Sequence, residues 1–195
     1  MKEQPSPPRR QRNIDLRSRE YLTPNEVESL IRAARRQGRH GHRDATMILL
    51  AYSHGLRVSE LTTMKWNQVD LKQSLLHVHR LKNGQPSTHP LRGSEIRALR
   101  KVSRNYPDQH FVFISERKGP ITPARFRKIV YRAGEKAKIG MPIHPHMLRH
   151  SIGFKLANDG QDTRAIQHYL GHRNIQHTVR YTQLSPERFK DFWND

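Results

Sequence analysis

Histidine, arginine and tyrosine residues in the C-terminal quarter of the sequence are spaced so that together they could carry out a phosphoryl transfer. His146 and Arg149 stand three positions apart. His172 follows a Leu-Gly pair, and Tyr181 comes nine positions after it. A tyrosine hydroxyl becomes a nucleophile once its proton is removed, and an arginine fork can hold two phosphate oxygens at once. This order and spacing indicate metal-free chemistry on a phosphodiester.

A second arginine, Arg57, is the next candidate. Negative charge on the non-bridging phosphate oxygens must be met by fixed cationic donors when no metal is present. Arg57 follows Gly55, where a helix is expected to end, and Glu60 is placed to orient its guanidinium. In a chain this rich in arginine, any one arginine alone is more often a surface or phosphate-backbone contact. Tyr181 alone could equally be a half-buried structural tyrosine.

The overall charge points to a polyanionic partner. Lys and Arg number 36 against 17 Asp and Glu, which gives a net charge of +19 and a pI near 11.0. Nucleic acid is the leading candidate for a domain this basic. A membrane-surface protein would gather its basic residues opposite a wide apolar helical face, whereas here they are scattered over every segment. At 195 residues the chain is most simply one domain, or one domain with a short arm.

Cellular location and cofactors are predicted mainly from what the sequence lacks. There is no cysteine, no apolar run at the start that could be a signal peptide, and no stretch near the roughly 20 apolar residues of a membrane span. We therefore expect a soluble, cytoplasmic, nucleoid-associated protein with no membrane partner. His144, His146 and His150 could suggest a metal site, but no acidic residue lies among them and Arg149 would repel a cation. No metal and no other cofactor is expected.

Hydrophobic periodicity predicts a mainly helical fold with a small antiparallel β-sheet, of the α+β class. Thr23, Pro24 and Glu26 form a capping-box start for the first helix. Asn83-Gly84 is a strong hairpin signal inside a region of strands. We expect helices over about 24–38, 43–54, 58–64, 94–104 and 122–136, strands within about 66–91, a candidate short strand at about 111–114, and three or four helices within about 147–193.

Four segments together resemble the successive signature segments of the tyrosine recombinase family. They read AYSHGLRVSEL at 51–61, HMLRH at 146–150, LGH at 170–172 and TVRYT at 178–182. The resemblance covers the chain from about residue 22 to its end, in the order and at the separations usual for the family. It implies the tyrosine recombinase catalytic-domain fold over residues 21–195 and an enzyme that breaks and rejoins DNA.

The resemblance also implies a role for each candidate residue. Tyr181 would attack the scissile phosphate, leaving a 3′-phosphotyrosyl link and a free 5′-hydroxyl, and a 5′-hydroxyl of another strand would reverse the step. Arg57, Arg149 and His172 would bind the phosphate oxygens. His146 would take the tyrosine proton, since a histidine pKa lies near neutrality.

Two further residues take their expected roles from the family. Family members carry a lysine on the β-hairpin that protonates the leaving oxygen, and Lys82 is in the matching position. Lys72 is the alternative, although it lies before the hairpin strand. His150, directly after the second arginine, is expected to buttress the site.

A narrower resemblance is to the enterobacterial fimbrial phase-switch recombinases. It rests on the short length and on HRLKNG at 79–84, THPL at 88–91, IHPHMLRHS at 143–151 and YLGHRNI at 169–175. Those proteins invert a short promoter-bearing DNA segment and so switch fimbrial genes. The resemblance implies double-stranded DNA with inverted-repeat sites, a homo-tetramer on paired sites, and accessory DNA-bending proteins.

The sequence departs from the general family at its N-terminal end. Most members carry a helical core-binding domain there, whereas we expect only a flexible basic arm over residues 1–20. Its arginines could track DNA phosphates, or the arm could be a solvated tail without a role. These arginines are Arg9, Arg10, Arg12, Arg17 and Arg19.

At the C-terminal end, a short helix over about 185–193 would place its aromatic side chains on one face. That face would pack on its own domain or on a neighbouring subunit. Three other functions share the fold or the chemistry and stay open: a non-catalytic DNA-binding regulator, an integrase or excisionase of a mobile element, and a type IB topoisomerase.

Overall fold

The helices predicted within the described residues form, and a capping box in the sequence sets where the first of them begins. The computed structural model describes residues 19–80 and 86–183. α1 (Pro24–Arg35) begins after Thr23, whose hydroxyl accepts the Glu26 amide proton while the Glu26 carboxylate accepts that of Thr23 at 2.8 Å. The predicted capping box is confirmed. α2 (Gly41–Ser53) begins two residues before its predicted start and ends just before Gly55, whose φ of 56° lies in the left-handed region that favours glycine.

The remaining helices follow the predicted order. Pro123 and Pro145 each occupy the first turn of their helix, where the missing amide proton costs no hydrogen bond. These helices are α3 (Val58–Thr62), α4 (Gly93–Asn105), α5 (Pro123–Lys136), α6 (Pro145–Asn158), α7 (Thr163–Leu170) and α8 (Gln176–Gln183). The expected helix at about 185–193 lies outside the described residues, and so does the predicted arm except for its last two residues. Of the arm's arginines, Arg19 is described, and it pairs with the Glu26 carboxylate.

The sheet is small and antiparallel, as predicted. After the 3₁₀ turn η2 (Trp66–Gln68), β1 (Val69–Asp70), β2 (Leu75–Val78) and β3 (Ser87–Pro90) pair in that order. Leu76 lies opposite His89 in the β2–β3 ladder. The turn that closes this hairpin lies outside the described residues. The mainly helical, α+β fold class is therefore confirmed.

The candidate strand at 111–114 is wrong. Phe111 and Ile114 each make one isolated bridge, to Lys65 and Pro120, and no ladder forms between them. Val112, Phe113 and Ile114 are buried in the core of the protein. The apolar run therefore signals burial in an irregular segment, a distinction that periodicity cannot make over so few residues.

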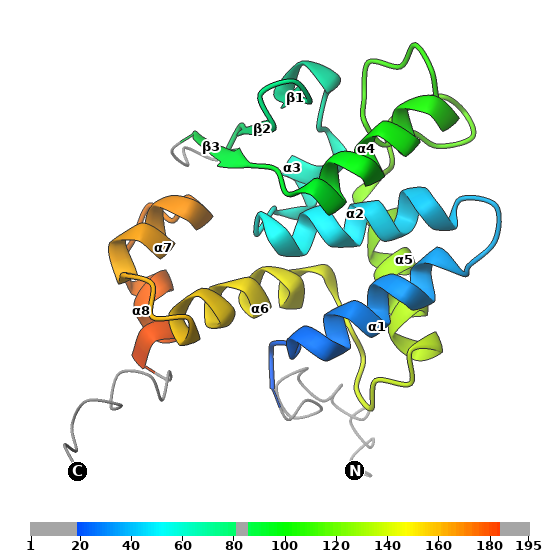
Figure 1. Cartoon of the computed structure of the whole chain (residues 1–195). Helices are drawn as coiled ribbons and strands as arrows, with labels where there is room; N and C mark the ends of the chain where they lie inside the picture. The colour runs from blue at the N-terminus through cyan, green and yellow to red at the C-terminus, as the bar shows by residue number, and fades with distance from the viewer. Residues whose placement is uncertain (1–18, 81–85, 184–195) are drawn as a thin grey trace, which may run out of the picture.

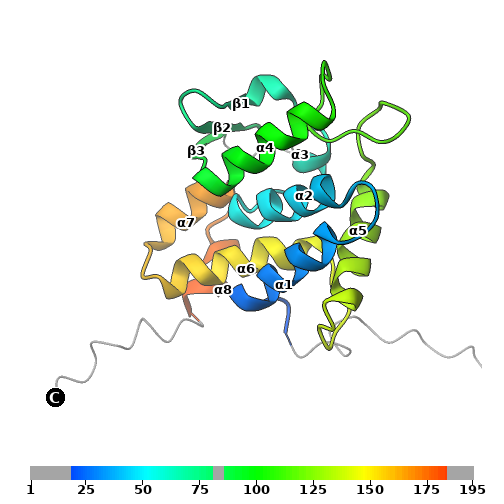
Figure 2. The same cartoon turned by 45° about the vertical axis from the view of Figure 1, so that its right-hand side comes forward.

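Two hydrophobic clusters divide the domain. The larger, which we call the main core, joins α1–α5 and the sheet to the first half of α6 through residues such as Leu30, Leu50 and Leu99. The smaller, which we call the satellite core, holds Ile152, Ala157, Ile166, Leu170 and Tyr181, from the second half of α6, α7 and α8. In both views α7 and α8 lie at the end of α6 that is far from α5 (Figure 1; Figure 2). No helix within the described ranges is both long and apolar enough to cross a membrane.

Candidate active site

Arg149, on α6, lies between the two cores and joins them. Its side chain is 1% exposed, and its guanidinium donates one hydrogen bond to the Gly55 carbonyl and another, at 2.6 Å, to the Leu170 carbonyl. A Cβ at position 55 would lie 2.4 Å from Leu170 Cδ2, so only glycine allows these two segments to approach so closely. Burial, together with nearby Arg57 and Arg80, lowers the Arg149 pKa to about 9. The residue therefore stays cationic at neutral pH.

Arg57 is held from the main-core side. It caps the start of α3, and its Nη1 lies 2.8 Å from Oε1 of Glu60, the residue predicted to orient it. The Arg57 amide also donates to Oε2 of Glu60 at 2.8 Å. The Glu60 side chain is 2% exposed, whereas 31% of the Arg57 side chain remains exposed. The contact expected from their spacing is thus confirmed, and Arg57 is left open to a ligand.

Tyr181, on α8, is buried in the satellite core at 1% exposure. Its hydroxyl hydrogen-bonds Nδ1 of His150 at 2.8 Å, and burial raises its pKa. The His146 ring lies edge-on to the His150 ring, with centroids 4.5 Å apart. His150 therefore contacts the phenol directly, a closer role than the buttress expected, and His146 stands one ring further away.

His172 reaches the site from the turn after α7. The turn needs Gly171, which takes a φ of 63° in the left-handed region. Nδ1 of His172 hydrogen-bonds the Thr178 hydroxyl at 2.8 Å, and its ring centroid lies 6.2 Å from that of Tyr181. The sequence places Thr178 in the same signature segment as Tyr181 but does not predict its contact with His172. Its side-chain contact depends on the packing of α8 against the turn.

The site is strongly electropositive, and the pKa values of three of its histidines lie below the ordinary value. Burial, followed by nearby cationic groups, lowers the pKa of His172 to about 3. Burial and the neighbouring His146 lower the pKa of His150 to about 3, and burial with Arg149 lowers that of His146. An anion entering the site would relieve this excess positive charge and raise all three pKa values.

One cavity of about 170 Å³ gathers nearly all the predicted residues. Lys82 lies outside the described residues. Lys72 sits in the turn between β1 and β2, where its amide bonds Asp70, and it does not line the cavity. The lining residues are Arg57, His146, Arg149, His150, His172, His177, Arg180 and Tyr181. Sequence reasoning missed His177 and Arg180, although Arg180 precedes Tyr181 and His177 lies one helical turn before it.

A second cavity, of about 640 Å³, adjoins the first because Arg57, His172 and His177 line both. Arg164 and Arg173 add further positive charge, and no acidic residue is among its described lining residues. The two cavities together form what we call the basic trough.

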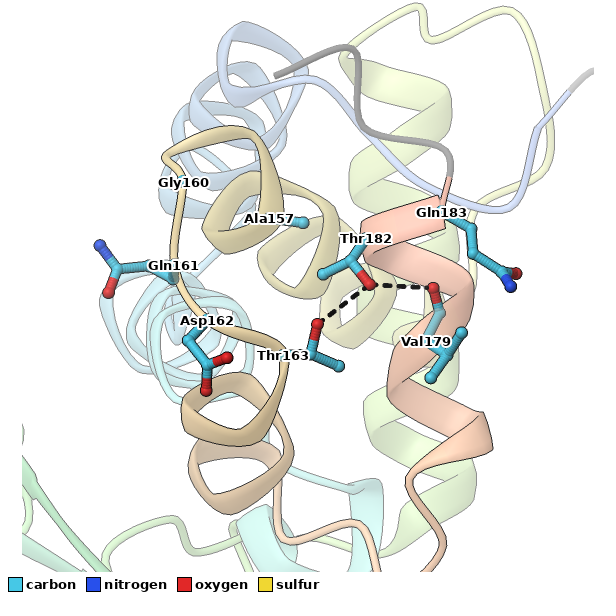
Figure 3. A pocket seen from close by; sticks show the side chains of 8 residues that line it. All are labelled: Ala157, Gly160, Gln161, Asp162, Thr163, Val179, Thr182 and Gln183. Carbon is cyan, nitrogen blue, oxygen red and sulfur yellow. Dashed lines mark hydrogen bonds between the residues drawn. The ribbon is translucent and has the colours of Figure 1, made fainter. Parts of the chain in front are cut away.

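A third cavity lies between the end of α6, the start of α7 and α8, and it contains none of the candidate residues (Figure 3). Its volume is about 510 Å³. On one wall the Thr163 hydroxyl donates to Thr182, which in turn donates to the Val179 carbonyl (Figure 3).

Comparison with known proteins decides the family. The model of the phage integrase family matches residues 20–188. The chain belongs to the phage integrase family. This family member is 43% identical over 185 residues to the type 1 fimbriae regulatory protein FimB of Escherichia coli K12, with 92% of each chain covered. It is 41% identical over 181 residues to FimE of the same strain, with 90% of this chain and 91% of that protein covered. The expected membership of the tyrosine recombinases, and the likeness to fimbrial proteins, are confirmed.

Solved structures agree with this assignment. The crystal structure of the XerA recombinase matches this phage integrase family member with a TM-score of 0.78 and 26% identity over 90% of this chain. The match spans 65% of that longer chain. The fold is therefore that of the tyrosine recombinase catalytic domain, within which the candidate site was expected.

Proposed function

We propose that this protein is a site-specific recombinase that cleaves and rejoins DNA through a covalent bond to Tyr181. The observation that carries the proposal is the single cavity where Arg57, Arg149 and His172 meet Tyr181. These residues come from four separate helices or turns, and their convergence supplies both cations and a nucleophile. Family membership supports the same chemistry.

The two arginines would bind the scissile phosphate. The two carbonyl contacts use one N–H on each Nη of Arg149, so its other donors remain available to phosphate oxygens. Arg57 is fixed by Glu60 through one Nη and is partly exposed. Charge that develops on the non-bridging oxygens then meets preorganised donors.

The transfer step exchanges one phosphate ester for another. The Tyr181 oxygen forms a bond to phosphorus while the bond from phosphorus to the 5′ oxygen breaks. The phenol proton passes to a histidine, either to His146, the base expected from the family, or to His150, which already holds the hydroxyl. Lys82 would give its proton to the departing 5′ oxygen. Attack by a 5′-hydroxyl of another strand reverses each transfer and releases the tyrosine.

We further propose that the DNA follows the basic trough and carries inverted-repeat sites flanking a promoter-bearing segment. The net charge of +19 and the cations that line the trough, including Arg164 and Arg173, support a path for the phosphate backbone. The identity to FimB and FimE over nine-tenths of the chain supports control of fimbrial phase variation by inversion. A homo-tetramer on two paired sites and accessory DNA-bending proteins complete the proposal.

The test is a nicked duplex made from inverted repeats beside the gene, in which cleavage releases a short fragment and traps the covalent adduct. Wild-type protein should form an adduct that survives denaturation, and Tyr181→Phe should form none. Tyr169→Phe is the matched control, because Tyr169 packs against the same satellite core and its hydroxyl donates to the Ser53 carbonyl at 2.6 Å. It should keep the adduct. Adduct formation by Tyr181→Phe, or its absence in the wild type, would overturn the proposal.

A further inference from the structure

Arg80, two residues after the end of β2, is a buried arginine that the proposed mechanism does not use. Its side chain is 0% exposed, and it lines neither of the two cavities that form the basic trough. Arg80 therefore cannot touch a phosphate in this arrangement. Its contacts nevertheless lead directly to Arg57.

The link between them is Glu60. Oε2 of Glu60 accepts from Arg80 Nη1 at 2.9 Å, while Oε1 accepts from Arg57 Nη1 at 2.8 Å. One buried carboxylate thus lies between two guanidinium groups. Although burial would raise the Glu60 pKa, Arg80 and then Arg57 lower it, so the group stays ionised. Without Arg80 the carboxylate would be buried with only Arg57 to balance it.

Arg80 is itself fixed from the satellite side. Its Nη2 donates to the Tyr169 carbonyl at 2.5 Å, near the end of α7. A Cβ at position 171 would lie 2.7 Å from Arg80 Nε, so Gly171 leaves space for the guanidinium. Arg80 Nε is buried without a hydrogen-bond partner among the described residues, and the Gly171 backbone packs closely against it.

We propose that Arg80 is a positioning residue for the recombination step, acting on Arg57 through the shared carboxylate of Glu60. Arg80 occupies one carboxylate oxygen, so that Glu60 turns the other toward Arg57 and fixes the direction of its guanidinium. The inference rests on the proposed function, because Arg57 matters only if the cavity binds a phosphate.

The test measures single-turnover cleavage of the nicked duplex at increasing protein concentration. Arg80→Met should lower the rate at saturating protein by about 100-fold, since a small misplacement of a catalytic group costs that much. The half-saturating protein concentration should change by less than about threefold, because Arg80 does not contact DNA. Arg80→Lys should recover to within about 10-fold of the wild type, since an ammonium can pair with Glu60 but lacks the fork that also reaches Tyr169.

Arg43 is the matched control. It too is a buried arginine that bonds a carboxylate, Asp44, and a backbone carbonyl, that of Ile114. Neither partner lines the catalytic cavity. Arg43→Met should lower the thermal midpoint yet leave the saturating cleavage rate within about twofold of the wild type, because independent sites act separately.

A double-mutant cycle separates positioning from plain structural support. In an Arg57→Ala background, Arg80→Met should change the saturating rate by less than about threefold, since the residue through which it acts is gone. An equal fold-loss in both backgrounds would overturn the inference, as would slow cleavage by Arg43→Met. If Arg80→Met does not fold, Arg80→Lys in the same two backgrounds decides by the same criterion. A wild type without adduct overturns the proposed function and this inference together, whereas wild-type rates in the Arg80 variants overturn the inference alone.

Discussion

The main core and the satellite core hold opposite halves of one site. Arg57 directly precedes α3 and Glu60 lies on it, and α3 packs into the main core. Tyr181 belongs to the satellite core, and the turn that carries His172 follows Leu170 of that core. The satellite core has few members and borders the cavity at the end of α8. Segments with few buried apolar contacts open most easily. The difference places Arg57 on the larger core and the nucleophile on the smaller one, which we expect to open more easily.

Removing the hydrogen bonds by which Arg149 links the two cores should have the largest effect on cleavage. Arg149 donates to Gly55 on one side and to Leu170 on the other. Arg149→Lys keeps the charge but cannot make both contacts and bind a phosphate as well. The cleavage rate in the nicked-duplex assay should fall by about 10³-fold, as for loss of a main transition-state donor. Arg104→Lys, at an exposed position in the last turn of α4, should cleave like the wild type.

A cavity cut in the main core tests whether the cores open separately. Leu99 is fully buried there, and Leu99→Ala should lower the free energy of unfolding by about 2–5 kcal/mol in urea titrations. Amide hydrogen exchange should quicken in α2 and α4 and stay unchanged in α7 and α8, which open locally. Equal loss of protection in α7 and α8 would show one cooperative unit and remove the distinction.

Adding a methyl group against the Tyr181 ring should slow cleavage by less. A Cβ at position 153 would lie 2.7 Å from Cε2 of Tyr181, so Gly153→Ala forces the ring aside. Overpacking costs about 1–3 kcal/mol and outweighs the gain of up to about 1 kcal/mol from replacing a helical glycine. Adduct formation should slow by about 10- to 100-fold. Gly119→Ala, where nothing lies within 4 Å of the added Cβ, should leave both stability and cleavage unchanged.

Acidification should destabilise the protein through its buried histidines, two of which line the catalytic cavity. Burial lowers the pKa of His89, His150 and His172 to about 3, against 6.5 for an ordinary histidine. Below pH 6.5 the unfolded chain binds more protons at these histidines than the folded chain does. Their contribution to stability is therefore fully present above pH 6.5 and is lost as the pH drops toward about 3. The melting temperature should decrease between about pH 7 and pH 5. His150→Gln should flatten part of that slope, and an unchanged slope would contradict the assignment.

The sequence predicted the residue types of the site better than their contacts. Arg57, His146, Arg149, His172 and Tyr181 were identified because phosphoryl transfer restricts which side chains can serve and because their order matches a known family. All of them line one cavity, while their catalytic roles await the variants above.

What the sequence could not predict depends on packing between distant elements. The bond from Tyr181 to His150 requires α8 to lie against α6. Arg80 follows a short strand in a chain rich in arginine, and only packing brings it to Glu60 of α3 and to the Tyr169 carbonyl of α7. The wrong strand at 111–114 has the same origin, because local pattern reports burial but not pairing.

The 1% exposure of Tyr181 bears on how the free protein can be chemically labelled. A phenol-directed reagent such as a sulfonyl fluoride would modify Tyr131, which is 45% exposed, long before it reached the nucleophile. The extent of Tyr181 modification would then depend on how often α8 separates from α6. The rate at which Tyr181 is labelled, measured by mass spectrometry in the absence of DNA, would thus report how often the site opens.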